Sequence, residues 1–259
     1  MLKKKPFKNY FGGKEGNGVY QTIINHIRPH VNYLEWCLGG GAVYRYKRPS
    51  KYSYLNDLNE NVYTEWKNFF VNEEKMKVII EGNYYNKQTR ITLTNVCVMK
   101  LLKQYVGFPD KTVIFLDLPY PHFTRTSNTR YKHELTNKQH EIILKQCLQI
   151  VKKYPLTDIL ITCYKNKLYD KILAGWYTTE YDTITRAGKK RKECLYYNFK
   201  KPTELHDYRY LGNNFYKRQK MRQKINRYVK KLSALPEIER NAIMFNLNEI
   251  KNDKSNFKA

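Results

Sequence analysis

A short apolar segment ends in residues that could do chemistry. Val113 to Leu116 is a run of bulky side chains, and Asp117, Pro119 and Tyr120 follow it. A run of this length, bounded by turn-forming residues, predicts a buried parallel strand over 113–117. Polar residues at the C-terminal end of such a strand lie where open α/β sheets bind their ligands. Asp117 and Tyr120 are therefore the first candidates for catalysis.

A glycine-rich turn supplies a second candidate site. Val31 to Trp36 predicts the first strand, and Cys37-Leu38-Gly39-Gly40-Gly41 follows it directly. Glycines let the backbone pass close to a ligand, and a helix that starts at the turn offers free N–H groups. The next predicted strand, Tyr52 to Asn56, ends at Asp57, near the spacing at which an acid hydrogen-bonds ribose hydroxyls. This sequence of elements predicts a nucleoside-binding site.

Two further charged residues fit a ligand site. Lys14 lies in the glycine-rich segment 6–18, which can approach the carboxylate or phosphate of a ligand closely. Glu35 lies on the first predicted strand, where a buried carboxylate is costly without a cationic partner. The five cysteines and six histidines show no spacing typical of zinc. We therefore expect reduced thiols and no metal.

The elements that must position these residues alternate between strands and helices. Helices are predicted over 19–28, 61–70, 96–105, 137–151 and 166–173, and further strands over 91–94 and 158–162. Thr136 is the expected cap of the helix that starts at Asn137. Strands over 178–184 and 193–199 form an expected hairpin around an almost wholly basic connection, 185–192. This order predicts an α/β fold with a mostly parallel sheet and an antiparallel C-terminal edge hairpin.

The chain changes in texture after Pro202. We expect one domain over 1–200 without a large separate insert, a basic helical extension over 201–251 and a disordered tail over 252–259. The extension could contact DNA, or it could be a solvated hairpin that caps the main domain, and the sequence leaves both open.

The charge of the chain indicates its class of partner. Lys and Arg number 48 against 23 Asp and Glu, which gives a net charge of +25. Such an excess predicts a polyanionic partner, and nucleic acid comes before membrane because no amphipathic anchor is evident. No apolar run approaches the length of a membrane span, and no apolar segment follows the basic residues at the start. We expect a cytoplasmic protein without a membrane partner.

At this point the motifs resemble a known family, the Dam-type DNA adenine-N6 methyltransferases, over roughly residues 7–200. The resemblance rests on four motifs in the family's order: Tyr10-Phe11-Gly12-Gly13-Lys14, Leu34 to Gly41, Asn56-Asp57 and Asp117-Leu118-Pro119-Tyr120. Tyr131 to Thr136 and the Thr185 to Glu193 hairpin support it. It implies a Rossmann-like methyltransferase fold.

The resemblance also implies a reaction. S-adenosylmethionine would be the methyl donor, and the N6 amino group of adenine in double-stranded DNA the acceptor, with the base flipped out of the duplex. Asp117 and the carbonyl of Leu118 would accept the two N6 hydrogens, and Pro119 belongs to the same turn. Tyr120 would stack on the base. Such contacts make the nitrogen a better nucleophile.

The remaining site residues are also implied by the resemblance. Lys14 should meet the methionine carboxylate of the donor and Glu35 its ammonium group, while Asp57 should hold the ribose. The other predicted donor contacts are Tyr10, Cys37, Gly39, Gly41 and Cys97. The predicted nucleic-acid contacts are Arg125, Arg130 and Lys132 in the 121–135 loop and Arg186, Lys189, Lys190 and Arg191 in the basic connection.

The sequence departs from the family's pattern in four places. Leu118 replaces a proline, Trp36-Cys37 replaces a Pro-Phe pair, and Cys97 lies where an aspartate is usual. The interval between Asp57 and Asp117 is too short for a sizeable target-recognition insert. Two alternatives to an active DNA adenine methyltransferase stay open. One is a catalytically weakened methyltransferase fold that acts as a DNA-binding protein, and the other is an RNA adenine methyltransferase. The target site, the oligomeric state and a role in restriction-modification, phage protection or regulation also stay open.

Overall fold

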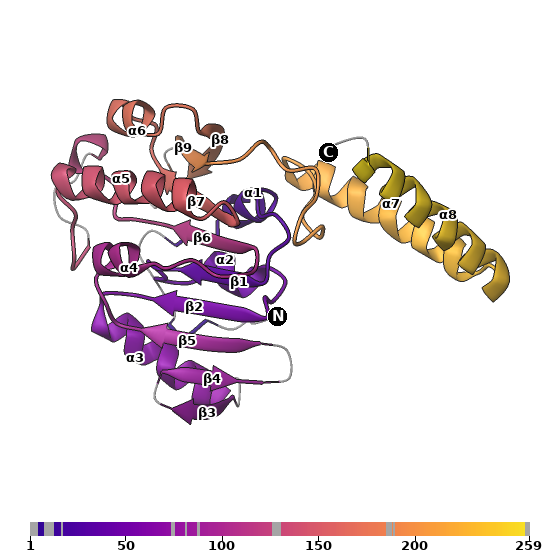
Figure 1. The fold of residues 1–259 in the computed structure, drawn as a ribbon, viewed down its shortest axis with the longest axis horizontal. Helices are drawn as coiled ribbons and strands as arrows, with labels where there is room; N and C mark the ends of the chain where they lie inside the picture. The colour runs from indigo at the N-terminus through magenta and orange to yellow at the C-terminus, as the bar shows by residue number, and fades with distance from the viewer. Residues whose placement is uncertain are drawn as a thin grey trace. The chain divides into compact units, whose positions relative to one another are not determined.

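The computed structural model describes residues 5–7, 13–16, 18–73, 76–80, 82–86, 89–125, 131–184, 188 and 190–256. The chain divides into two compact units, Met1–Tyr210 and Leu211–Ala259. Figure 1 shows the sheet of the first unit and the two long helices of the second.

The first unit is built around a nine-stranded sheet, formed by the described residues. The strand order is β3-β4-β5-β2-β1-β6-β7-β9-β8. The strands are β1 (Asn32–Glu35), β2 (Tyr52–Asn56), β3 (Lys77–Ile80), β4 (Asn83–Tyr85), β5 (Arg90–Thr94), β6 (Thr112–Leu116), β7 (Thr157–Cys163), β8 (Tyr177–Ile184) and β9 (Lys190–Tyr197).

The centre of the sheet is parallel and both edges are antiparallel. β5, β2, β1, β6 and β7 run parallel to one another, with Asn32 of β1 opposite Tyr52 of β2 and Thr112 of β6. β9 and β8 add an antiparallel hairpin beyond β7, and β4 and β3 add a second antiparallel edge beyond β5. The predicted α/β fold with a Rossmann-like sheet and an antiparallel C-terminal hairpin is confirmed.

Helices cover both faces of the sheet, as parallel strands require. The helices of the first unit are α1 (Val19–Ile24), α2 (Ala42–Tyr46), α3 (Glu60–Asn68), α4 (Val98–Gln104), α5 (Asn137–Lys153) and α6 (Lys167–Ile172), with a π-helical turn η1 (Phe69–Glu73) and a 3-10 turn η2 (His122–Thr124). α5 contacts both α4 and α6, and α1 contacts α2 (Figure 1).

Alternate residues of the strands feed two separate cores. In β6, Val113 and Phe115 pack in the core that includes α1, α2 and α3, whereas Ile114 and Leu116 pack in the core that includes α4, α5 and α6. Every residue of β6 is buried. The apolar run therefore faces helices on both sides, and the first polar side chain beyond it, Asp117, comes where the strand ends.

Local sequence signals account for several helix boundaries. Thr136 caps α5: its hydroxyl accepts from the N–H of Gln139 at 3.2 Å, and the Gln139 side chain accepts from the N–H of Thr136 at 2.8 Å. This reciprocal box satisfies two N–H groups that would otherwise lack partners. The predicted cap is thus confirmed, and α5 extends two residues further than the predicted end, to Lys153.

Two parts of the sheet differ from the sequence-based expectation. Residues 72–90, for which no element was predicted, include β3 and β4. β3 and β4 are only four and three residues long, too short to show the alternation that identifies a strand. β4 pairs with the edge of β5, and β3 pairs with β4. β9 begins at Lys190, within the predicted basic connection, because the β8–β9 ladder continues to the Ile184–Lys190 pair.

The second unit consists of two helices, α7 (Phe215–Ser233) and α8 (Glu237–Asn256). Asn214 caps α7 by accepting from the N–H of Lys217 at 2.9 Å. α8 reaches Asn256, so the first part of the tail predicted to be disordered, 252–259, is helical. No helix in the described ranges combines the length and the apolar character needed to cross a membrane.

Candidate active site

The candidate site lies where the chain order reverses in the sheet. From β1 the chain proceeds through β2 to β5 on one side, and β6 and β7 lie on the other. The carboxyl ends of neighbouring parallel strands open a crevice at such a point. Cys37 follows β1, Asp57 follows β2 and Asp117 follows β6, so tertiary structure brings three separate motifs to one edge.

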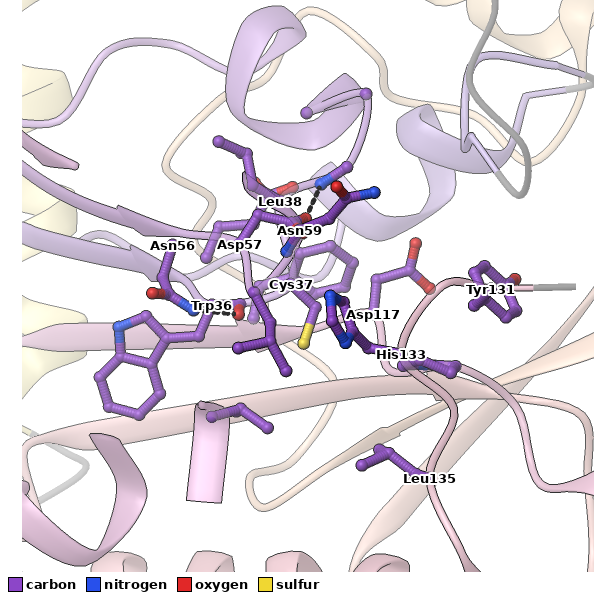
Figure 2. A pocket seen from close by; sticks show the side chains of 18 of the residues that line it. Trp36, Cys37, Leu38, Asn56, Asp57, Asn59, Asp117, Tyr131, His133 and Leu135 are labelled. Atoms are coloured by element: carbon purple, nitrogen blue, oxygen red, sulfur yellow. Dashed lines mark hydrogen bonds between the residues drawn. The ribbon is translucent and has the colours of Figure 1, made fainter. Parts of the chain in front are cut away.

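A cavity of about 410 Å³ occupies this crevice. Figure 2 shows Cys37, Asp57 and Asp117 around it. Its lining includes most of the predicted donor-binding residues and two of the predicted catalytic ones: Lys14, Glu35, Cys37, Gly39, Gly41, Asp57, Cys97, Asp117 and Pro119. Tyr10 lies outside the described residues. The sequence-based grouping of these motifs into one site agrees with their positions.

Asp57 holds the glycine-rich turn in place. Its Oδ2 accepts from the N–H of Gly39 at 2.7 Å, and its Oδ1 accepts from the N–H of Asn59 at 2.9 Å. Each carboxylate oxygen has a second lone pair, so Asp57 can brace the turn and still accept from a ligand hydroxyl. Burial raises the pKa of this carboxyl, and the two N–H groups oppose that shift.

Gly41 is required by packing inside the protein. Its φ is +58°, in the left-handed region, and a Cβ at this position would lie 2.4 Å from the ring of Trp66. The same indole donates to the carbonyl of Gly39 at 2.9 Å. Trp66 therefore fixes the turn by packing against Gly41 and hydrogen-bonding Gly39, contacts that the glycine motif alone does not reveal.

Asn56 joins the two walls of the cavity. Its side-chain amide donates to the carbonyl of Trp36 at 3.0 Å (Figure 2). The same amide donates to the carbonyl of Val96 at 2.9 Å, and its oxygen accepts from the N–H of Val96 at 2.9 Å. These bonds tie the end of β1 to the turn that leads into α4. Cys97, which follows this turn, lines the cavity together with Cys37.

Glu35 is a buried acid inside the cavity wall. It is 2% exposed, and its Oε2 accepts from the hydroxyl of Tyr33 at 2.7 Å. Burial raises the pKa of the carboxyl to about 8; Asp117 adds to this shift, while Tyr33 and Lys47 oppose it. A cation placed in the cavity beside Glu35 would favour its ionised form.

Asp117 is held through one carboxylate oxygen. Its Oδ1 accepts from the hydroxyl of Thr162 at 2.7 Å and lies 2.9 Å from the ammonium nitrogen of Lys14. Its Oδ2 accepts no hydrogen bond from any residue that the structure describes. The pKa of Asp117 is raised by burial, and Lys14 and Thr162 oppose the rise. One oxygen is thus anchored and the other remains available to a ligand.

Lys14 links Asp117 to a second buried acid. Its Nζ donates to the hydroxyl of Tyr120 at 2.8 Å and lies 3.6 Å from Glu193, and the Tyr120 hydroxyl donates to Glu193 at 2.8 Å. Although burial lowers the pKa of Lys14, Asp117 and Glu193 raise it above its ordinary value. Tyr181 also donates to Glu193, at 3.1 Å. Glu193 was not among the predicted site residues. The one feature of the sequence that could have indicated it is its position as a single acid directly after a basic run.

The other motif residues differ in their access to the cavity. Leu118 is buried, as suits a residue expected to act through its backbone carbonyl. Tyr120 is 6% exposed and packs edge-on against Tyr164, with ring centroids 4.8 Å apart. It does not line the cavity, whereas Pro119 and Tyr131 do. Tyr131 is therefore a second aromatic ring beside Asp117.

The residues predicted to contact nucleic acid have different surroundings. Arg125 forms a two-point ion pair with Glu134, at 3.1 and 2.6 Å, and its side chain is 7% exposed. This pair stabilises the loop itself, so Arg125 is committed within the protein. Lys132, Lys190 and Arg191 are exposed. The other three predicted contacts, Arg130, Arg186 and Lys189, lie outside the described residues.

The described part of the chain contains no group of three or more His, Cys, Asp and Glu residues that could hold a metal ion. The five cysteines carry free thiols.

The chain matches no protein-family model and no curated protein sequence. Solved structures give low-level matches. They include the precorrin-8W decarboxylase of Methanobacterium thermoautotrophicum, with 12% identity, 72% of this chain and 92% of that chain covered, and a TM-score of 0.43. A SAM-dependent methyltransferase from Agrobacterium tumefaciens matches with 13% identity, 69% and 58% coverage and a TM-score of 0.42.

An rRNA methylase from Streptococcus thermophilus matches with 11% identity, over 69% of this chain and 93% of that chain, with a TM-score of 0.43. Identities and scores at this level assign no residue roles. The roles below depend on the geometry of this chain and on its motifs.

Proposed function

We propose that the protein transfers a methyl group from S-adenosylmethionine to the N6 amino group of adenine in DNA. The observation that carries the proposal is the position of the Asp117 carboxylate and the hydrogen bonding of its two oxygens. It lies at the carboxyl end of β6 in the wall of the cavity, with Oδ1 anchored by Thr162 and Lys14 and Oδ2 without a described partner. A fixed carboxylate with one free oxygen is suited to accept an amino hydrogen.

The lining of the cavity fits the proposed donor. Glu35 and Asp57 provide carboxylates for an ammonium group and for ribose hydroxyls. Lys14 also lines the cavity, so a donor carboxylate beside it would compete with Asp117 and Glu193 for its charge. Val98, Met99 and Leu135 provide apolar surface for a base. S-adenosylmethionine supplies an electrophilic methyl group attached to a sulfonium.

The residues of the Asp117 turn act on the acceptor. The lone pair of adenine N6 is delocalised into the ring, so this nitrogen is a poor nucleophile. Asp117 Oδ2 would accept one N6 hydrogen and the carbonyl of Leu118 the other, which turns the lone pair toward the methyl group. The new N–C bond would form as the S–CH3 bond of the donor breaks, with its electron pair returning to sulfur as a neutral thioether. The nitrogen would then lose one proton, which Asp117 is placed to accept.

Lys14 and Glu193 support this step from behind. Lys14 favours the ionised form of Asp117, because its charge opposes the rise in pKa that burial causes. Glu193 in turn holds Lys14 and Tyr120. Alanine variants distinguish Tyr120 from Tyr131 as the ring that stacks on the base. The Ala substitution that weakens acceptor binding identifies the stacking ring, and the Ala substitution of the other tyrosine should leave acceptor binding unchanged.

The deciding experiment is transfer of a labelled methyl group from S-adenosylmethionine to unmethylated genomic DNA, with sequencing that detects N6-methyladenine. We expect Asp117→Ala to lower transfer by about 10²- to 10⁴-fold. Calorimetry with the donor checks that the variant still binds it, and an RNA acceptor provides the parallel test of the RNA alternative. Undiminished transfer by the variant would remove Asp117 from the mechanism.

The weakened-enzyme alternative has a specific basis in the cavity. Cys37 and Cys97 line it at positions where stronger hydrogen-bonding or aromatic groups would favour the donor. Burial raises the pKa of the Cys37 thiol, so it stays neutral. Tight, salt-dependent nucleic-acid binding without any donor binding would support this alternative.

A further inference from the structure

A second hollow of about 630 Å³ lies on the surface of the first unit. It is lined by three segments: Phe123 and Thr124 of η2, residues 164–168, which lead from the end of β7 into the start of α6, and Arg191 and Lys192 of β9. It shares no lining residue with the donor cavity. The proposed sites of the donor and of the target base both lie at the first cavity and not in this hollow.

Each of the three segments also positions the candidate active site. η2 follows the turn that contains Asp117 and Tyr120. Thr162, which hydrogen-bonds Asp117, lies two residues before Tyr164, whose ring packs on that of Tyr120 at 4.8 Å. Glu193, which accepts from Tyr120, follows Lys192 directly. The hollow is therefore the surface immediately next to the proposed target site.

The charge of the hollow is opposite to that of the donor cavity. Among the nine residues that line it, four are cations and none is an acid. Lys165 and Lys192 lie 3.1 and 3.8 Å from Glu180, so that acid partly balances them. Lys167 and Arg191 form no ion pair with a described acid. These two side chains can therefore neutralise an anion outside the protein.

The hollow also contains an exposed aromatic ring. Phe123 is 54% exposed, and Tyr164 is half-buried beside it in the lining. Exposure of an aromatic ring to water is unfavourable, and the surrounding cations do not cover it. The combination suits nucleic acid, because bases stack on aromatic rings while cations bind the phosphate backbone. A paired base cannot stack on a protein side chain without leaving its duplex.

We propose that this hollow binds the nucleotide next to the target adenosine in an unpaired strand, with its base on Phe123 and its phosphate on Lys167 and Arg191. This proposal rests on the proposed function, because it assumes that the adjacent site holds a base. It narrows the acceptor to nucleic acid that is single-stranded, or locally opened, around the target. DNA and RNA share this chemistry.

The test compares two charge-matched double variants of the full chain. One carries Lys167→Gln and Arg191→Gln. The control carries Lys103→Gln and Lys111→Gln, two exposed lysines at the end of α4 and just before β6, away from the carboxyl ends of the strands. Binding of labelled single-stranded DNA and RNA oligonucleotides is measured by fluorescence anisotropy over a range of salt concentrations.

We expect only the first variant to weaken binding, and its salt slope to fall by about 0.7 for each phosphate that the protein no longer neutralises. Phe123→Ala should raise the dissociation constant for single strands about tenfold, and Phe123→Trp should preserve it. Calorimetry with S-adenosylmethionine should give the same donor affinity for all variants, which confirms that they are folded. The oligonucleotide whose affinity falls further identifies DNA or RNA as the ligand.

The outcomes separate this proposal from the proposed function. If no acceptor is methylated but the Lys167/Arg191 variant binds more weakly than the control, the hollow is a nucleic-acid site and the methyltransferase proposal fails. If methyl transfer occurs and the two double variants bind and react equally, the hollow is not part of the acceptor site. An unchanged affinity after Phe123→Ala would also overturn the stacking assignment.

Discussion

Two carboxylates, those of the half-buried Asp117 and the buried Glu193, share the charge of Lys14 at the candidate site. Asp117 and Glu193 lie 2.9 and 3.6 Å from its ammonium nitrogen. Removing one partner of such a group leaves an uncompensated charge in a poorly solvated place. The motif residue Asp117 is thus only one part of a unit in which Lys14, Thr162 and Glu193 decide its orientation and ionisation. Glu35, across the cavity, lies 2% exposed with no ion-pair partner among the described residues.

The raised pKa of Glu35 predicts proton release when the donor binds. Its carboxyl has a pKa of about 8, mainly because it is buried, so it is largely protonated at about pH 7. An ammonium group beside it requires the ionised form. We expect donor affinity to rise with pH up to about 8, and calorimetry in buffers of different ionisation enthalpy to detect the released proton.

Glu35→Gln is the control for this linkage, because it keeps the shape of the side chain but cannot ionise. The pH dependence should disappear in this variant. The protein alone should behave in the opposite sense: since folding raises the pKa of Glu35 from 4.5 to about 8, its contribution to the free energy of unfolding decreases as pH rises through that window. Equal proton release by both proteins would assign the effect to another group.

At the scale of elements, the cavity depends on how strand ends are tied together. Asp57 binds the turn before α2, Asn56 binds the turn before α4, and Trp66 of α3 supports Gly39 and Gly41. α4, like α2, begins without a side-chain cap. Its N-cap is Cys97, whose side chain makes no capping hydrogen bond. A helix start of this kind is less stable than one capped by Asp or Ser.

Substitution of Cys97 should improve both α4 and the donor site. Asp is a strong N-cap residue, so Cys97→Asp is expected to raise the free energy of unfolding by about 1 kcal/mol. A carboxylate here can also accept from the amino group of the donor's adenine, where the thiol is a weak partner. Thermal unfolding and donor calorimetry measure the two effects.

Cys97→Ser separates the cap from the charge. It should give a similar gain in stability without the gain in donor affinity. If Asp and Ser tighten donor binding equally, the improvement comes from a more stable helix start and no direct contact needs to be invoked.

At the scale of the whole molecule, two groups of basic residues are candidates for contact with nucleic acid. One is the hollow beside the active-site motif, and the other is α7, whose cations are Lys217, Arg218, Lys220, Arg222, Lys224, Arg227, Lys230 and Lys231. α7 has no acidic residue and no buried residue. The buried residues of the described chain all precede the second unit. The first unit thus contains the core and the candidate site, and the second contributes charge.

Removal of Leu211–Ala259 tests this division of roles. We expect the shortened chain to lose the helical signal of α7 and α8 from its circular dichroism spectrum but to keep a cooperative unfolding transition and its donor affinity, because both cores and the cavity lie before Leu211. Its affinity for DNA should fall at low salt, with a smaller salt slope. A salt slope equal to that of the full chain would show that α7 makes no contact with phosphates.

The sequence was sufficient where a signal is local. The apolar run of β6, the cap at Thr136 and the glycine turn after β1 were all predictable, because periodicity, capping and turn preferences act over a few residues. The grouping of Lys14, Glu35, Asp57 and Asp117 followed from motif order and from the rule that parallel strand ends meet at one edge.

Only the tertiary structure decided which side chains are occupied by ion pairs or packing contacts within the protein. Arg125 was predicted to contact nucleic acid, but Glu134 holds it, and Gly41 is explained by Trp66. The pairing of β9 with β7 positions Glu193 near Lys14. β4 forms as a strand by pairing with the edge strand β5, and β3 then pairs with β4. These contacts join residues far apart in the chain. Their free energy depends on burial and distance, which a linear pattern of residues does not contain.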